Sequence, residues 1–181
     1  MTPYLKRRAE KESELSPSRV QELFDYDPIT GTLRWRNRPE GPKKWNTKFS
    51  GKVAGYPNGG CIYIRINSVG FKGHRLVWAH YYGEWPKNYV DHIDGNALNN
   101  AISNLRHVDF KQSAWNTRTR SNNILGLKNI HQHAYGGYMV RFYRWRTPLF
   151  REYFGDLETA IAVRNLIAPT IYGEYNRREA Q

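Results

Sequence analysis

An aspartate and a histidine stand next to each other in the most polar part of the chain, residues 89–109. The segment 89–93 predicts a strand, so Asp91 and His92 lie at its end with side chains on opposite sides. A carboxylate suits a hard cation such as Mg²⁺, which often takes only one or two protein oxygens. Histidine is a base at neutral pH. Phosphodiester hydrolysis needs both, because a cation stabilises charge on the phosphate and a base activates water.

The elements around this pair are a loop, a second strand and a helix. The loop is rich in asparagine, and Asn96, Asn99 and Asn100 are typical of turn-forming residues. A short strand is predicted at 105–108. Asp109 then predicts a helix start, with Gln112 completing a capping box, and the helix runs over roughly 110–118. This helix can bring a third polar group to the strand end.

Several motifs in this region resemble the HNH (ββα-metal) endonuclease family, in particular phage-borne, homing-type members. They are His74-Arg75-Leu76-Val77-Trp78, Gly83-Glu84-Trp85-Pro86, Val90-Asp91-His92-Ile93-Asp94-Gly95-Asn96 and Asn104-Leu105-Arg106, preceded by the block Asp27-Pro28-Ile29-Thr30-Gly31-Thr32-Leu33-Arg34-Trp35. The resemblance implies that Asp91 is a metal ligand, that His92 is the general base and that Asn104 braces the loop. It also implies 5′-phosphate and 3′-hydroxyl products.

One position departs from the family pattern. The family usually places an asparagine or histidine on the helix nine residues after the central asparagine, where this chain has Ser113. A serine hydroxyl is a weaker donor than an amide oxygen. Asn116 lies one turn later on the same helix face and is the alternative ligand. The expected cofactor is Mg²⁺ or Mn²⁺.

Composition sets further bounds on the chain. It has 181 residues, a formal net charge of +12, 39% hydrophobic and 14% aromatic residues. This is too apolar and aromatic for a disordered basic tail, and the positive charge predicts nucleic acid as partner. No run of 18 apolar residues occurs, and the first fifteen residues have no apolar run, so we expect neither a membrane span nor a secretory signal. Cys61 is the only cysteine, so no structural zinc is expected.

The remaining sequence predicts supporting elements. Residues 1–15 are charged and predicted to be frayed. Ser16 and Pro17 predict the start of a short helix, and residues 37–60 look like a loop. Residues 61–66 alternate as a half-buried strand, and 74–82 predicts a helix ending at Gly83.

The last part of the chain resembles the Apetala-type (ethylene-response-factor-like) DNA-binding domain. The resemblance rests on Gly126-Leu127, Gly137-Tyr138-Met139-Val140-Arg141-Phe142, Tyr153-Phe154-Gly155-Asp156, Ala160 and Ile171-Tyr172-Gly173-Glu174-Tyr175-Asn176. It implies that a three-stranded sheet lies in the major groove. Strand 138–144 alternates, with Val140 and Phe142 on one side and Arg141 and Tyr143 on the other.

The expected fold class is therefore α+β, with a ββα-metal HNH core, an N-terminal small α/β subdomain and a C-terminal three-stranded antiparallel sheet packed on one helix. The expected domains are a frayed terminus (1–15), a DNA-binding or support subdomain (16–73), the nuclease core (74–118), a linker (119–125) and the Apetala-type domain (126–176). The expected DNA contacts are Arg75, Arg106, Arg118, Arg120, Arg141, Tyr143, Arg144, Arg146 and Arg151.

The predicted function is metal-dependent cleavage of double-stranded DNA by a monomer or homodimer, by nicking or double-strand cleavage, in a homing or restriction role. We expect a cytoplasmic protein, from a phage acting in its host or from a bacterium, with no membrane partner. The main alternative is a DNA-binding regulator or degenerate HNH protein that does not cut. A second alternative, from the mixing of basic and aromatic residues, is an RNA-binding protein.

Overall fold

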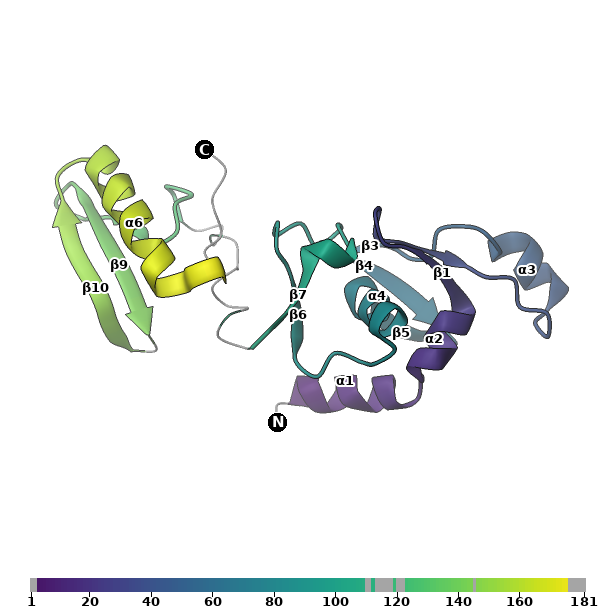
Figure 1. Cartoon of the computed structure of the whole chain (residues 1–181). Helices are drawn as coiled ribbons and strands as arrows, with labels where there is room; N and C mark the ends of the chain where they lie inside the picture. Colours follow the sequence, from purple (N-terminus) through teal and green to yellow (C-terminus); the bar gives the residue numbers. More distant parts are fainter. Residues whose placement is uncertain (1–2, 110–111, 113–118, 120–122, 145, 176–181) are drawn as a thin grey trace. The chain divides into compact units, whose positions relative to one another are not determined.

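The structure is a computed structural model that describes residues 3–109, 112, 119, 123–144 and 146–175. It divides the chain into two compact units, Met1–Phe110 and Lys111–Gln181, called unit 1 and unit 2 below. Both units combine helices with small antiparallel sheets (Figure 1). Among the residues described, no helix is both long and apolar enough to cross a membrane.

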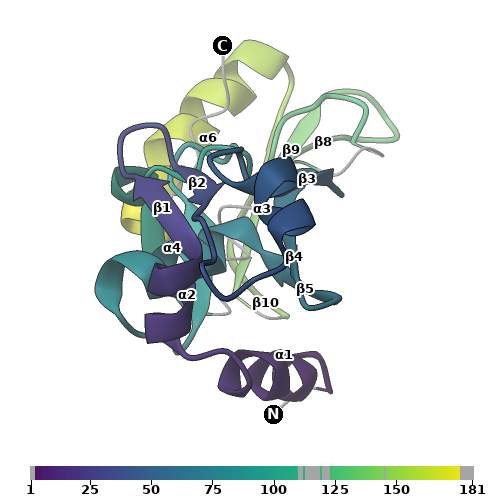
Figure 2. The ribbon, with the colours of Figure 1, turned by 90° about the vertical axis from the view of Figure 1, so that its right-hand side faces the viewer.

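Unit 1 begins with two helices and a hairpin. Helix α1 (Pro3–Ser13) is followed by α2 (Pro17–Leu23), where the Ser16 side chain accepts a hydrogen bond from the Arg19 amide, as expected of an N-cap. Strands β1 (Phe24–Asp27) and β2 (Thr32–Trp35) form the hairpin. Helix α2 and β1 both lie against helix α4 (Gly73–Tyr82) (Figure 2).

Helix α4 is the centre of the unit 1 core. Its first seven residues, from Gly73 to Ala79, are all buried, and Gly83 ends it in the left-handed conformation with φ 70°. The sheet β3 (Tyr56–Asn58), β4 (Cys61–Ile66) and β5 (Val69–Lys72) packs against α4 and contributes Ile64, Ile66 and Phe71 to the core. Helix α3 (Lys43–Phe49) lies between β2 and this sheet in the sequence.

The predicted strand pair of the candidate site is present as a second small hairpin. Strand β6 (Tyr89–His92) pairs antiparallel with β7 (Leu105–Val108), and the short 3-10 helix η1 (Ile102–Asn104) leads into β7. The helix predicted at 110–118 lies outside the described residues, apart from the helical residue Gln112.

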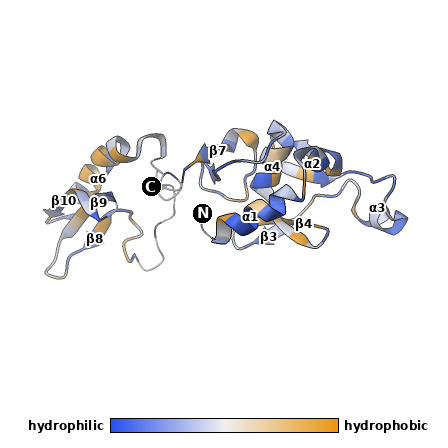
Figure 3. Ribbon diagram, turned by 90° about the horizontal axis from the view of Figure 1, so that it is seen from below, coloured by the Kyte–Doolittle hydropathy of each residue, from blue (hydrophilic) through white to orange (hydrophobic). Residues whose placement is uncertain are grey.

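The described residues of unit 2 form one sheet and one long helix. Strands β8 (Ile130–Gln132), β9 (Tyr138–Arg144) and β10 (Thr147–Phe154) form a three-stranded antiparallel sheet with β9 in the middle. Helix α6 (Leu157–Tyr172) starts at Asp156, whose side chain accepts from the Thr159 amide, and the 3-10 helix η2 (Gly173–Tyr175) follows it. Ile130, Val140 and Phe142 of the sheet are buried with Ala160 and Ala168 of α6. In Figure 3, α6 carries more of the hydrophobic colour than the charged helix α1.

Two expectations about the N-terminal part were wrong. The prediction of a frayed terminus over 1–15 fails because α1 is helical and docks through a buried ion pair between Glu12 and Arg75. The segment 37–60 is only partly a loop, because α3 forms where Trp45 packs edge-on against Trp35 and tilted against Phe49. Both elements depend on contacts that are distant in sequence, which local composition does not reveal.

Candidate active site

Asp91 lies near the end of β6, directly opposite Arg106 of β7. An Arg106 Nη atom lies 3.2 Å from the Asp91 carboxylate, and both side chains are 16% exposed. The carboxylate is thus mostly buried and lies next to a positive charge. A phosphate approaching Asp91 would also meet Arg106. The DNA contact expected of Arg106 is compatible with this position and stays a prediction.

Asn104 spans the loop that joins the two strands. Its side-chain nitrogen donates to the Asp94 carboxylate at 2.9 Å and to the Asn99 carbonyl at 2.8 Å, while its side-chain oxygen accepts from the Asp94 amide at 3.0 Å. Its backbone carbonyl accepts from the Ile93 amide at 2.8 Å. These four bonds tie the start of the loop to its end, immediately after His92.

Asp94 is the second organising residue of the loop. Burial raises the pKa of its carboxyl, but hydrogen bonds from the Asn99 side chain, the Asn96 amide and the Asn104 side chain lower it more, and the net pKa lies below the usual value. Asp94 therefore acts as an ionised acceptor for three donors of the same loop. This makes the loop a closed hydrogen-bonded structure rather than a flexible connection.

His92 is buried, with 6% of its surface exposed. Its Nε2 lies 3.0 Å from the side-chain oxygen of Asn100. Asn100 is itself buried, with 4% exposed, so it is not one of the turn-forming residues expected from the sequence. Sequence reasoning missed this contact, and nothing local in the pair Asn99-Asn100 separates the second residue from the first.

His74, the second residue of α4, lies on another side of His92. The two imidazole rings are 5.1 Å apart and perpendicular. Burial lowers the pKa of His74 well below its usual value, and the nearby His92, Lys72 and Arg75 lower it further. His74 is therefore a neutral ring at the back of the site, and its Nδ1 is buried with no hydrogen-bond partner among the described residues.

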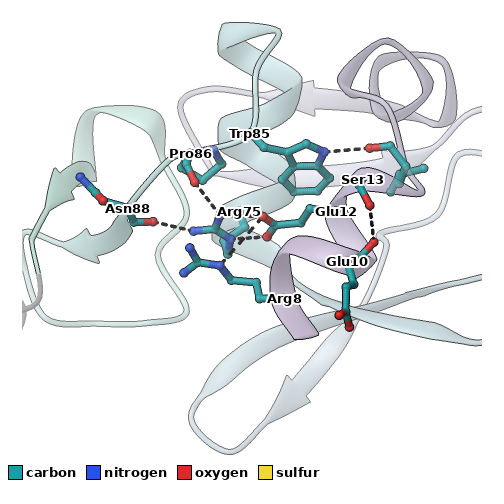
Figure 4. Close-up of polar contacts among 9 residues, drawn as sticks. Arg8, Glu10, Glu12, Ser13, Arg75, Trp85, Pro86 and Asn88 are labelled. Atoms are coloured by element: carbon teal, nitrogen blue, oxygen red, sulfur yellow. Dashed lines mark hydrogen bonds and ion pairs between the residues drawn. The ribbon is translucent and has the colours of Figure 1, made fainter. Parts of the chain in front are cut away.

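Arg75 was predicted to contact DNA, and the structure corrects this. Its side chain is only 5% exposed, and its guanidinium makes two hydrogen bonds to the Glu12 carboxylate. It also donates to the backbone carbonyls of Pro86 at 2.7 Å and Asn88 at 2.9 Å (Figure 4). All of this serves to fix α1 and the segment before β6 onto α4, so Arg75 is a structural residue.

In unit 2, three of the predicted DNA contacts lie on one face of the sheet. Val140 and Phe142 are fully buried, so the alternation of β9 places Arg141 and Tyr143 on the face away from α6. Arg151 of β10 is directly opposite Arg141 in the register. Arg144 and Arg146 are exposed at the turn between β9 and β10. Two arginines in opposed positions repel one another unless an anion lies between them.

Four predicted site residues lie outside the described part of the chain, namely Ser113, Asn116, Arg118 and Arg120. The described residues contain no group of three or more His, Cys, Asp or Glu able to hold a metal ion. The donor types still fit a hard cation, because Asp91 offers a carboxylate and Ser113 or Asn116 would offer a hydroxyl or amide oxygen.

Comparisons with known proteins found one family match and several relatives. Residues 72–113 match the model of a family described as HNH endonuclease. Protein 3.8 of Escherichia phage T7 is 47% identical over 58 residues, which cover 32% of this chain and 48% of that protein. Two proteins of Acanthamoeba polyphaga mimivirus, each described as an uncharacterized HNH endonuclease, also match. One is 34% identical over 118 residues (64% of this chain, 34% of that protein), and the other 35% over 94 residues (51% and 48%).

The family match places residues 72–113 with HNH endonucleases, and the descriptions of the two mimivirus relatives also support a nuclease. The matched region spans half or less of the length of each relative. No solved structure matches the chain.

Proposed function

We propose that this protein is a metal-dependent endonuclease that hydrolyses phosphodiester bonds in double-stranded DNA. The observation that carries the proposal is the Asp91-His92 pair at the end of β6, in a segment that matches HNH endonucleases and is followed by a loop fixed by Asn104. The pair offers a cation ligand and a base on neighbouring residues, which is the combination that phosphodiester hydrolysis requires.

Each residue has a role in this proposal. Asp91, with Ser113 or Asn116, would hold Mg²⁺ or Mn²⁺, and a cation there would supply positive charge against the phosphate. His92 takes a proton from the attacking water. Asn104 keeps the loop closed behind His92, and Arg106 keeps Asp91 in its orientation.

Basic surfaces in both units support an anionic partner. In unit 1, the lining of a pocket between α1 and β5 includes Arg7, Arg8, Lys11 and Lys72, together with the acidic Glu12 and the aromatic Tyr63 and Phe71. In unit 2, Arg141, Tyr143 and Arg151 share the open sheet face, as an Apetala-type DNA-binding domain would require. Arginine binds phosphate or reads guanine, and an exposed tyrosine adds a stacking surface. We include DNA binding by unit 2 in the proposal.

Cleavage of supercoiled plasmid tests the proposal. The wild-type protein is expected to nick the plasmid with Mg²⁺ or Mn²⁺ and not with EDTA, and His92→Ala is expected to lose nearly all activity because no base remains. His107→Ala is the matched control, since His107 is exposed on the neighbouring strand and stacks on Trp78. No cleavage by wild type with either metal would contradict the proposal.

The alternative is a protein that binds DNA without cutting it, and Ser113 is the residue that favours it. If Ser113 is a weakened ligand, Ser113→Asn is expected to cut faster than wild type. If wild type is inactive and Ser113→Asn is active, the protein is a nuclease that has lost its metal ligand and has kept DNA binding. Salt-dependent binding without products in either variant would favour a regulator.

A further inference from the structure

We propose that Asn100 is the positioning residue of His92, and that the β1–β2 hairpin holds Asn100 in place. The inference rests on the proposed function, in which His92 is the base. It adds an element that lies outside the family match, since the match begins at residue 72 and the hairpin ends at Trp35.

The contact between the two side chains bears on which nitrogen of His92 carries a proton. The side-chain oxygen of Asn100 can only accept a hydrogen bond, and it lies 3.0 Å from His92 Nε2. This contact favours the tautomer with the proton on Nε2, in which the basic lone pair of the ring is on Nδ1. Asn100 thus favours one tautomer and orients the ring.

Asn100 is held from three directions. The Tyr26 hydroxyl of β1 donates to its backbone carbonyl at 3.0 Å. Burial raises the pKa of Tyr26 to about 12, so the hydroxyl stays protonated and remains a donor. On the other side, a Cβ atom built on Gly73 would lie 3.1 Å from the Asn100 side-chain nitrogen, so the start of α4 confines the amide.

The third contact is the tip of the hairpin. Gly31 has φ +71°, and a Cβ atom built there would overlap the backbone of Asn100 and Ala101. The tip is itself rigid, because the Asp27 carboxylate accepts from the Ile29 amide at 2.9 Å and from the Thr30 hydroxyl at 2.7 Å. The Gly31 amide also donates to the Asp27 carbonyl at 2.9 Å. A stiff hairpin tip in backbone contact with residues 100–101 fixes the position of the His92 partner.

The hairpin is tested with two matched glycine substitutions and one hydroxyl deletion. Gly31→Ala and Gly51→Ala carry a similar backbone penalty, since Gly51 has φ +74°, but a Cβ at Gly51 meets nothing within 4 Å. Tyr26→Phe removes the hydroxyl that donates to the Asn100 carbonyl. We expect kcat for plasmid cleavage to fall in Gly31→Ala and Tyr26→Phe, with KM unchanged, and to stay at the wild-type value in Gly51→Ala. A wild-type kcat in all three variants, or an equal loss of kcat in Gly31→Ala and Gly51→Ala, would overturn the role of the hairpin.

Asn100 is tested by two variants of similar size. Asn100→Leu removes the acceptor, and Asn100→Asp keeps one. A misplaced or wrong-tautomer base costs on the order of a hundredfold or more in kcat, so we expect such a loss in Asn100→Leu and a much smaller one in Asn100→Asp. Equal losses in the two variants would show that Asn100 only supports the fold.

A spectroscopic measurement separates this inference from the proposed function. Long-range ¹H–¹⁵N correlation spectra report the tautomer of each histidine without DNA or metal, and His92→Gln identifies the signal of His92. We expect a protonated Nε2 in wild type and a changed tautomer ratio in Asn100→Leu. A proton on Nδ1 in wild type, or no change in Asn100→Leu, would overturn the inference whether or not the protein cuts DNA.

Discussion

His74 is a residue whose ionisation couples the fold to pH. Its ring is buried beside His92, and burial, with the nearby positive charges, lowers its pKa well below the value near 6.5 of an exposed histidine. In the unfolded chain the same ring takes up a proton near pH 6.5. The unfolded state therefore binds more protons than the folded state in mildly acidic solution.

The resulting prediction is a loss of stability as pH falls. The contribution of His74 is fully present above its unfolded pKa of about 6.5 and decreases below that pH, because protonation favours the unfolded chain. Urea unfolding at pH 7.5 and pH 5 checks this. His74→Leu is expected to show a smaller decrease between the two pH values than wild type. An equal decrease in both proteins would contradict the prediction.

At the residue scale, the candidate catalytic residues could be predicted from the sequence, but the residues that hold them in position could not. Asp91 and His92 could be singled out because their types and adjacency suit hydrolysis and stand in a recognisable motif. Asn100 and Tyr26 could not, since their contact spans 74 positions and neither residue type indicates it. Arg75 was misread because a surface-like residue type gives no sign of burial opposite Glu12.

At the scale of elements, the ion pair between Glu12 and Arg75 ties α1 to α4. Glu12 and Arg75 have side chains that are 11% and 5% exposed, and Trp85 donates to the Leu15 carbonyl at 2.7 Å just beyond the helix (Figure 4). The pair is stabilising only while both partners are present, because an unpaired buried charge is costly.

We expect Glu12→Ala to lower the free energy of unfolding by roughly 3–5 kcal/mol, as is usual when one partner of a buried ion pair is removed. Glu10→Ala, an exposed position on the same helix, is the control and should change it by no more than about 0.5 kcal/mol. Chemical denaturation of the two variants measures both. A similar small effect of the two substitutions would show that α1 is not anchored through Glu12.

Predictions of helices and strands were confirmed where the sequence carries a capping residue, a terminating glycine or a clear alternation. Ser16 and Pro17 marked the start of α2, Gly83 marked the end of α4, and alternation marked β4 and β9. Helix α6 includes Pro169 and continues to Tyr172. Ala168 and Tyr172 are buried in the unit 2 core, and this packing outweighs the one hydrogen bond that the proline removes.

At the scale of the whole molecule, the chain combines a unit with a candidate active site and a unit with a basic sheet face. If unit 2 serves binding and unit 1 serves cleavage, the two activities separate by mutation. Arg141 and Arg151 are the residues for this experiment because they are opposed on the open face and repel each other in the absence of an anion.

For the double variant Arg141→Ala/Arg151→Ala, we expect weaker binding to duplex DNA and unchanged kcat at saturating DNA. If each arginine contacts one phosphate, the slope of log K against log salt concentration falls by about two. The thermal unfolding temperature should not fall, since a like-charged pair is removed. Unchanged affinity, or a loss of affinity together with a loss of stability, would contradict a binding role for this face.

The hydrogen bond between Tyr26 and Asn100 also has a consequence for how the chain is made. Domains fold from the N-terminus as the ribosome releases them, and Tyr26 emerges 74 residues before Asn100. The hairpin is therefore released before the loop that it holds. During translation the loop can close only after Asn104 has left the exit tunnel, because the Asn104 side chain bonds both Asp94 and Asn99. A nascent chain that stops short of this point lacks the candidate active site.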